Sequence, residues 1–246
     1  MSEDQQLPAE IKSTAIDYVA SGAKSVLGIV PFVGSLLAEV AGSVIPNQRI
    51  DRIARFATAL QGRIAHLEEQ AVRGELKDEE FTELLEEALR QAARSTSDER
   101  REYLAAAIAN SLTRNAIKHS ETKHLLRIMG ELSDVEIIWL RFYQNPVIEG
   151  DQEFRNKHAA VLERKNAYIG SSTDELDQYA LQSNYRKHLV DLGLVTPVIS
   201  KGRDGQPEFD TFSGNFKISY HHTSPLGELL LRTIGLLQPD EQKAGA

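Results

Sequence analysis

The stretch HLVDLGLVTPVISKGRDGQ, residues 188–206, decides how the second half of the chain is organised. Its first residues, 188–192, are the end of a helix, and Gly193 suits the left-handed backbone position that follows the last helical residue. The Val- and Ile-rich run from Val195 to Ile199 favours a strand, and KGRDGQ, residues 201–206, is typical of a turn. The sequence therefore predicts a helix that leads directly into a β-ribbon.

The segments on either side extend this arrangement. A helical pattern covers residues 173–192, and Phe216 to Tyr220 alternates as a second strand. Ser224-Pro225 begins an apolar helix that continues to Ile234. Helices, a β-ribbon and a closing helix together are typical of a winged-helix domain. We therefore expect residues 131–246 to form a winged-helix-like α+β domain.

The first 130 residues show only helical periodicity. Between residues 47 and 73 apolar side chains recur at alternating spacings of three and four, and Gly74 is expected to close this helix. Such a seam packs against neighbouring helices, inside a bundle or between chains, and we favour the bundle. The seam consists of Ile50, Ile53, Ala57, Leu60, Ile64, Leu67 and Ala71.

Further helices complete the N-terminal bundle. They are predicted over residues 81–92, 97–112 and 120–131, and Ser133 with Glu136 forms a capping box for the next one. The predicted fold class is mainly α: a helical bundle over residues 1–130, followed by the winged-helix-like domain with its small β-ribbon.

The segment VLGIVPFVGSLLAEVAGSVIP, residues 26–46, has Glu39 as its only ionisable side chain. Its proline, its glycines and its carboxylate all disfavour a membrane span, so we interpret the segment as a buried hydrophobic hairpin. The alternative is a segment that is released to contact a membrane or an identical chain. The residues expected to act in that case are Pro31, Phe32, Gly34, Leu37 and Glu39.

Composition excludes several classes of chemistry. The 246 residues contain no cysteine, which rules out disulfides, zinc fingers and thiolate nucleophiles. The formal net charge is −8, and residues 68–87 hold nine acidic and two basic side chains, which would repel a nucleic-acid backbone. The N-terminus lacks the pattern of a secretory signal, so we expect a cytoplasmic protein, peripheral to the membrane if residues 26–46 are released.

No catalytic signature stands out. Ala23-Lys24-Ser25 lacks the glycines of a phosphate-binding loop, and neither G-x-S-x-G nor H-E-x-x-H occurs. His221 and His222 are adjacent on a predicted strand and so point to opposite faces. We therefore predict no catalytic, cofactor-binding or metal-binding residue, no cofactor and no small-molecule substrate.

The predicted winged-helix-like domain offers a surface for partners. Residues 181–222 hold five bases and four acids, a net charge of +1, which is modest for a face that reads DNA. We therefore favour protein contact over DNA binding. A winged-helix transcriptional regulator stays open, as does an enzyme built from ordinary surface residues. The expected contact residues are Gln182, Asn184, Arg186, Lys187, Lys201 and Arg203.

Four runs of sequence occur in a familiar order: ERREYLAAAIANSL (99–112), HSETKHLLRIMGELSDVEIIWL (119–140), YRKHLVDLGLV (185–195) and HHTSPLGELLLRTI (221–234). Over residues 95–235 this layout resembles the bacterial abortive infection alpha-like family. The resemblance implies a role in phage defence and supplies no catalytic residue. Together with the surface analysis, it predicts a non-enzymatic effector that acts through protein contacts or self-association.

Overall fold

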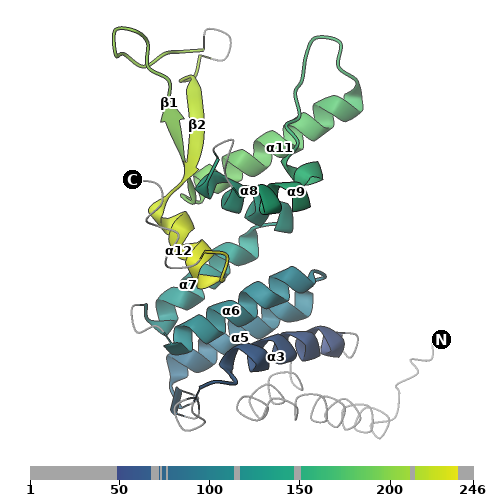
Figure 1. The fold of residues 1–246 in the computed structure, drawn as a ribbon, viewed down its shortest axis with the longest axis vertical. Helices are drawn as coiled ribbons and strands as arrows, with labels where there is room; N and C mark the ends of the chain where they lie inside the picture. The colour runs from purple at the N-terminus through teal and green to yellow at the C-terminus, as the bar shows by residue number, and fades with distance from the viewer. Residues whose placement is uncertain are drawn as a thin grey trace, which may run out of the picture. The chain divides into compact units, whose positions relative to one another are not determined.

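The structure, a computed structural model, describes residues 49–67, 72, 74–75, 77–113, 117–146, 151–210 and 214–237. This described part contains nine helices and one two-stranded antiparallel sheet (Figure 1). The prediction of a mainly helical protein with a small sheet is confirmed. None of the described helices is long and apolar enough to cross a bilayer. The predicted hairpin at residues 26–46, with its candidate residues from Pro31 to Glu39, lies outside the described residues.

The elements follow one another as helices, two strands and a last helix. The strands are β1 (Val195–Ile199) and β2 (Ile218–Thr223). The helices are α3 (Ile50–Ile64), α5 (Glu79–Arg94), α6 (Asp98–Thr113), α7 (His119–Glu131), α8 (Asp134–Gln144), α9 (Gln152–Lys157), α10 (Ala159–Leu162), α11 (Thr173–Asp191) and α12 (Pro225–Thr233).

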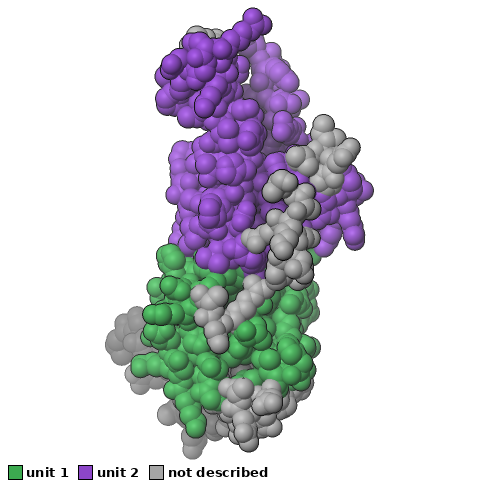
Figure 2. All heavy atoms as spheres, turned by 60° about the vertical axis from the view of Figure 1, so that its left-hand side comes forward, with its two compact units in different colours: residues 1–127, 233–235 green, residues 128–232, 236–246 purple. Residues whose placement is uncertain are grey.

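Contacts divide the chain into two compact units (Figure 2). Unit 1 contains the residues up to Arg127 together with Thr233–Gly235. Unit 2 contains Ile128–Arg232 and the residues from Leu236 onward. The sequence predicts a single boundary near residue 130, and no pattern in it signals that the end of α12 returns to unit 1.

In unit 1, α3, α5 and α6 lie side by side around an apolar core (Figure 1). Ile53, Ala57, Leu60 and Ile64 of the predicted seam are all buried, which confirms the seam from Ile53 to Ile64. Phe56 is buried beside them, because the face of a core helix is wider than a strict three-and-four seam.

The structure corrects the predicted end of this first helix. The seam predicts a helix to residue 73, but α3 ends at Ile64, where Leu67 N donates to Ile64 O (2.9 Å) in a tight turn. Gly74, expected to close the helix, itself has helical backbone. Because neither glycine nor proline marks residues 65–67, local sequence gives no signal for this end.

In unit 2, α8, α11 and the ribbon of β1 and β2 are the main elements (Figure 1). The predicted capping box at the start of α8 is confirmed, since Ser133 Oγ accepts from Glu136 N and the Glu136 carboxylate accepts from Ser133 N. Residues 152–162 form two short helices, α9 and α10, because His158 leaves the helical conformation between them.

The base of the ribbon is fixed to the helical part of unit 2. Gly193 has φ +71°, as predicted for the residue that closes α11. Ser224 N donates to Leu194 O (2.9 Å), and Thr223 Oγ1 donates to Leu140 O (3.2 Å). β2 begins at Ile218 rather than at Phe216, which forms an isolated bridge with Phe209. The bonds of Thr223 and Ser224 therefore anchor the base of the ribbon to α8 and to Leu194.

Candidate functional site

Large apolar side chains on the surface of the described chain are confined to residues 168–220 of unit 2. Monomeric proteins rarely expose contiguous apolar patches of large size, so such a concentration marks a contact surface. The exposed side chains are Tyr168, Ile169, Leu176, Tyr179, Leu181, Ile199, Phe209, Phe216, Ile218 and Tyr220.

Eight of these ten side chains, all except Tyr168 and Ile169, lie on two segments that we call the helical arm and the ribbon arm. The helical arm is residues 172–181, the start of α11 with its cap, and every one of its residues is exposed. The ribbon arm is residues 199–210 and 214–220, in which residues 214–220 are all exposed. The rings of Phe209 and Phe216 face each other across the ribbon with centroids 4.6 Å apart.

Two of the predicted contact residues are held inside unit 2 instead. Gln182 is buried, where its Oε1 accepts from Lys165 N (2.9 Å) and its Nε2 donates to Glu163 O (2.9 Å). Arg186 is half-buried, and its Nε donates to Tyr143 Oη (3.2 Å). Both side chains form hydrogen bonds within unit 2, so fewer of their donors and acceptors are available to a partner.

The other four predicted contact residues are exposed. Asn184 and Lys187 lie on α11, where Lys187 Nζ forms an ion pair with Asp191 Oδ2 (2.5 Å). Lys201 and Arg203 lie on the turn of the ribbon arm. The structure therefore places the two helix residues and the two turn residues on separate parts of unit 2.

A polar layer lies between α8, α11 and β2. The ring of His221 packs against Tyr143, with centroids 5.7 Å apart. Burial, and secondly the positive charge of Arg186, lower the pKa of His221 to about 4. Glu136 is buried and accepts from His188 Nδ1 (2.6 Å). These contacts hold α8, α11 and the base of the ribbon together. His221 packs against Tyr143 and Glu136 is hydrogen-bonded to His188, so both groups have a structural role.

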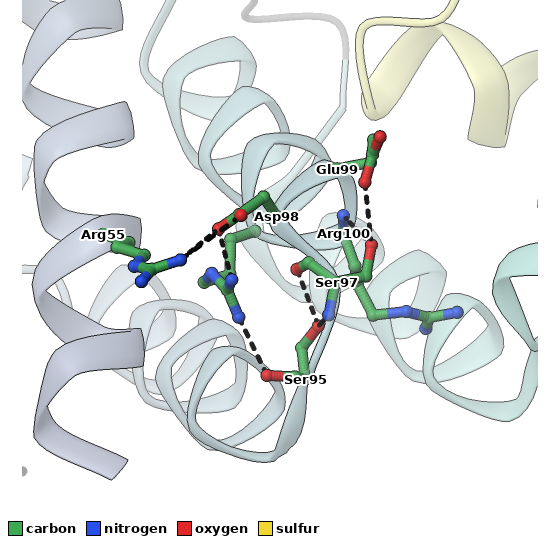
Figure 3. Close-up of polar contacts among 7 residues, drawn as sticks. Arg55, Ser95, Ser97, Asp98, Glu99 and Arg100 are labelled. Carbon is green, nitrogen blue, oxygen red and sulfur yellow. Dashed lines mark hydrogen bonds and ion pairs between the residues drawn. The ribbon is translucent and has the colours of Figure 1, made fainter.

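Unit 1 carries a network of ion pairs at the start of α6 (Figure 3). Arg55 reaches from α3 to Asp98 Oδ1 (3.2 Å), which also pairs with the buried guanidinium of Arg101. These hydrogen bonds, first that from Arg101, lower the pKa of Asp98. Arg101 Nη1 donates to Ser95 O (2.8 Å), so the network ties the end of α5 to the start of α6.

An open groove of about 640 Å³ runs beside this network, between α3 and α6. Its arginines Arg55, Arg63 and Arg101 are paired with Asp98 and Glu102. Each of these arginines already has an acidic partner within unit 1, so we assign no ligand to the groove.

Three potential metal ligands meet near the start of α5. Ligand atoms of Glu75, Asp78 and His119 all lie within 4.8 Å of one another. His119 Nε2 is 2.9 Å from Glu75 Oε2, and Asp78 Oδ1 accepts from Glu80 N (2.8 Å) as the cap of α5. An ion pair and a helix cap already account for this arrangement, so we assign no metal to it.

Comparison with known proteins adds no relative. No protein-family model, no curated protein and no solved structure matches the chain. The site therefore rests on the geometry of unit 2. The turn of the ribbon is predictable from the sequence, whereas the aromatic pair of Phe209 and Phe216 and the exposure of the helical arm are not. Their sequence patterns are the same as those of a packed strand and a packed helix. Only the structure shows that no other described residue covers their side chains.

Proposed function

We propose that the chain is a non-enzymatic interaction protein whose second unit binds protein through the helical arm and the ribbon arm. One observation carries this proposal: the exposed large apolar side chains of the described chain are confined to residues 168–220. Aromatic side chains supply contact area at a small cost in conformational entropy, which suits a protein interface.

The proposed module is winged-helix-like. Its support is the order of α8, α11, the ribbon and α12, in which a long helix leads into a hairpin of antiparallel strands. In this interpretation α11 takes the place of the recognition helix and the ribbon arm is the wing.

Charge favours protein over DNA as the partner. The ribbon arm holds the bases Lys201, Arg203 and Lys217 and an equal number of acids, so its net charge is zero. Lys217 is also paired with Glu208 (3.3 Å). The helical arm is acidic, and the whole chain carries −8. A duplex would gain few phosphate contacts and would meet repulsion.

The alternative function is a DNA-binding regulator. Fluorescence anisotropy with labelled duplex DNA at low and physiological salt separates the two. We expect no saturable binding. Tight binding that weakens with salt, and that is lost when Lys187, Lys201 and Arg203 are replaced by Ala, would establish the alternative.

We propose further that this interaction acts in phage defence, and the support is the resemblance of residues 95–235 to the abortive infection alpha-like family. A bacterial host that expresses the chain is challenged with a panel of phages. We expect fewer plaques with the wild-type chain and a return to the control number with Phe209→Ser/Phe216→Ser. The matched control Thr58→Ser alters an exposed side chain of α3 and should keep protection. Equal protection by both variants would contradict a role for the ribbon arm.

Residues 26–46 supply a second proposal, a hydrophobic segment that is released to contact a membrane. Its support is the sequence, in which Glu39 is the only ionisable side chain. A carboxylate in the bilayer is costly, so Glu39→Leu should increase flotation with phosphatidylethanolamine–phosphatidylglycerol vesicles, and Gly34→Arg should reduce it. If the wild-type chain and Glu39→Leu both stay with the soluble fraction after mild destabilisation, the segment serves as core.

A further inference from the structure

The helical arm is a helix without a core of its own. All ten residues from 172 to 181 are exposed, among them Leu176, Tyr179 and Leu181. The capping box of Ser172 and Glu175 fixes where the helix starts, but isolated helices of this length are marginal in water. The arm therefore gains stability from any surface that covers its apolar side chains.

The ribbon arm has the same property. A two-stranded hairpin is marginal by itself, and this one carries Phe209, Phe216, Ile218 and Tyr220 on its surface. Its base is anchored by Thr223 and Ser224, whereas no other strand of the described chain pairs with it. Covering its aromatic side chains would stabilise the ribbon as well as the contact.

The helical arm and the turn of the ribbon arm carry opposite charge, although the ribbon arm as a whole is neutral. The helical arm holds Asp174, Glu175 and Asp177 and no base, a net charge of −3. The turn of the ribbon arm, residues 201–206, holds Lys201 and Arg203 against Asp204, a net charge of +1. Neither cation of the turn has an ion-pair partner among the described residues, so both are available to the acids of another surface.

We propose that two copies of the chain associate through a reciprocal exchange in which the helical arm of each copy lies against the ribbon arm of the other. The proposal rests on the proposed function, because it names the partner of the same two arms. Such a contact is isologous and closes on itself, so it yields a dimer rather than a filament. It covers both exposed apolar sets at once and sets three acids of one copy against two bases of the other.

A second copy fits better than nucleic acid or a lipid surface. Both of those are anionic and would be repelled by the acidic helical arm. The acidic helical arm and the turn of the ribbon arm, residues 201–206 with net charge +1, are complementary to each other, and each copy supplies both.

Charge reversal tests the pairing. Sedimentation equilibrium of the full chain across the micromolar range should give a dimer of twice the chain mass of 27.4 kDa. Lys201→Glu/Arg203→Glu should raise the dimer Kd by about tenfold or more through like-charge repulsion. Adding Asp174→Lys/Asp177→Lys in the same chain should restore the wild-type Kd. If the first pair of substitutions weakens the dimer and the second pair does not restore its Kd, the two arms do not pair with each other.

Cysteine crosslinking tests the geometry, and the absence of native cysteine makes it unambiguous. Gln178→Cys lies on the helical arm and Gln206→Cys on the ribbon turn, both at exposed positions. A mixture of the two chains should form a disulfide-linked dimer far more readily than either chain alone. Asn156→Cys on α9, mixed with Gln206→Cys, is the matched control and should not crosslink.

The outcomes separate this inference from the proposed function. A chain that remains monomeric and fails to crosslink overturns the dimer. If such a monomer still loses phage protection in Phe209→Ser/Phe216→Ser, the ribbon arm binds a different protein and the proposed function stands. If Gln206→Cys crosslinks to itself more readily than to Gln178→Cys, ribbon meets ribbon and the reciprocal exchange is wrong.

Discussion

Gly227 sits where α12 passes closest to the end of α11. A Cβ added there would lie 2.2 Å from Leu194 O and 2.7 Å from Thr223 Cγ2, and the first of these atoms belongs to backbone that is fixed at the ribbon base. Gly227→Ala should therefore lower the free energy of unfolding by about 2–3 kcal/mol. Chemical denaturation followed by the fluorescence of Trp139, the only tryptophan, reports this change.

Gly62 provides the control for that substitution. It lies within α3, and a Cβ there would meet nothing within 4 Å. Gly62→Ala should raise stability by about 0.5–1 kcal/mol, because alanine is the better helix former. If the two substitutions have equal effects, the close approach at Gly227 does not exist in solution.

His221 makes unit 2 sensitive to acid. Its pKa is about 4 in the folded chain, against 6.5 for an unperturbed histidine, so the unfolded state binds the proton more readily between these values. The free energy of unfolding of unit 2 should be highest above pH 6.5, where His221 is neutral in both states, and should fall as the pH drops toward 4. Because the ring is half-exposed, we expect a loss of about 1 kcal/mol between pH 7 and pH 5.

A substitution isolates this contribution. His221→Phe keeps an aromatic ring against Tyr143 and should reduce the slope of stability with pH, measured by urea denaturation at several pH values. An unchanged slope in His221→Phe would show that other groups carry the acid sensitivity.

Two helices of unit 2 begin with the same capping box in different surroundings. At α8, the buried Glu136 carboxylate accepts from Ser133 N (2.7 Å) and Ser133 Oγ (2.8 Å). At α11, Ser172 and Glu175 repeat the motif in full exposure. Ser133→Ala should cost about 2 kcal/mol of global stability, since it removes a donor from a buried carboxylate.

Ser172→Ala should act locally. We expect it to speed hydrogen exchange in the helical arm, with a global cost below about 1 kcal/mol. Hydrogen exchange followed by mass spectrometry distinguishes the two responses, because only Ser133→Ala should accelerate exchange throughout unit 2. Equal global costs would contradict the difference in burial between the two caps.

The core of α3 allows a sharper substitution. Leu60 is fully buried, whereas Thr58 of the same helix is exposed. Leu60→Asp places an unpaired carboxylate in the core and should cost about 4 kcal/mol or more, enough to unfold unit 1. Thr58→Asp carries the same charge on the surface and should shift the thermal midpoint by little. Equal midpoints for the two variants would show that the seam is not core.

The sequence predicted those parts of the fold that depend on nearby residues. Ser133 with Glu136, and Gly193 at the end of α11, follow from cap chemistry within four residues, and both are confirmed. The burial of Gln182 and the hydrogen bond of Arg186 could not be predicted in this way. Their hydrogen-bond partners lie 17 to 43 residues away in the sequence, and a local sequence pattern does not show which distant residues come close. The same limit applies to the helical arm, whose apolar residues look like a core face until packing is known.

At the scale of the whole molecule, charge and apolar surface are divided between the units. The most acidic stretch, residues 68–87, belongs to unit 1, while the exposed aromatic residues belong to unit 2. A partner of the arms therefore meets a surface of mixed charge even though the chain as a whole carries −8. Net charge alone is a poor guide to the surface that binds, since screening confines electrostatic effects to about 10 Å.

The chain also returns to unit 1 at Thr233–Gly235, before its last residues rejoin unit 2, and this return offers a test of how the two units unfold. Ile234 is buried in unit 1, where the neighbouring Thr233 O accepts from Asn110 Nδ2 (2.9 Å). Ile234→Ala leaves a cavity there and should cost unit 1 about 2–4 kcal/mol. Circular dichroism reports the helices of both units, whereas Trp139 fluorescence reports unit 2 alone.

If each unit unfolds by itself, Ile234→Ala shifts part of the dichroism transition to lower denaturant and leaves the Trp139 transition in place. The control is Leu236→Ala, which alters a half-buried residue assigned to unit 2 and should move the Trp139 transition instead. Coincident shifts of both signals in Ile234→Ala would show one cooperative transition, in which the last helix makes the stability of each unit depend on the other.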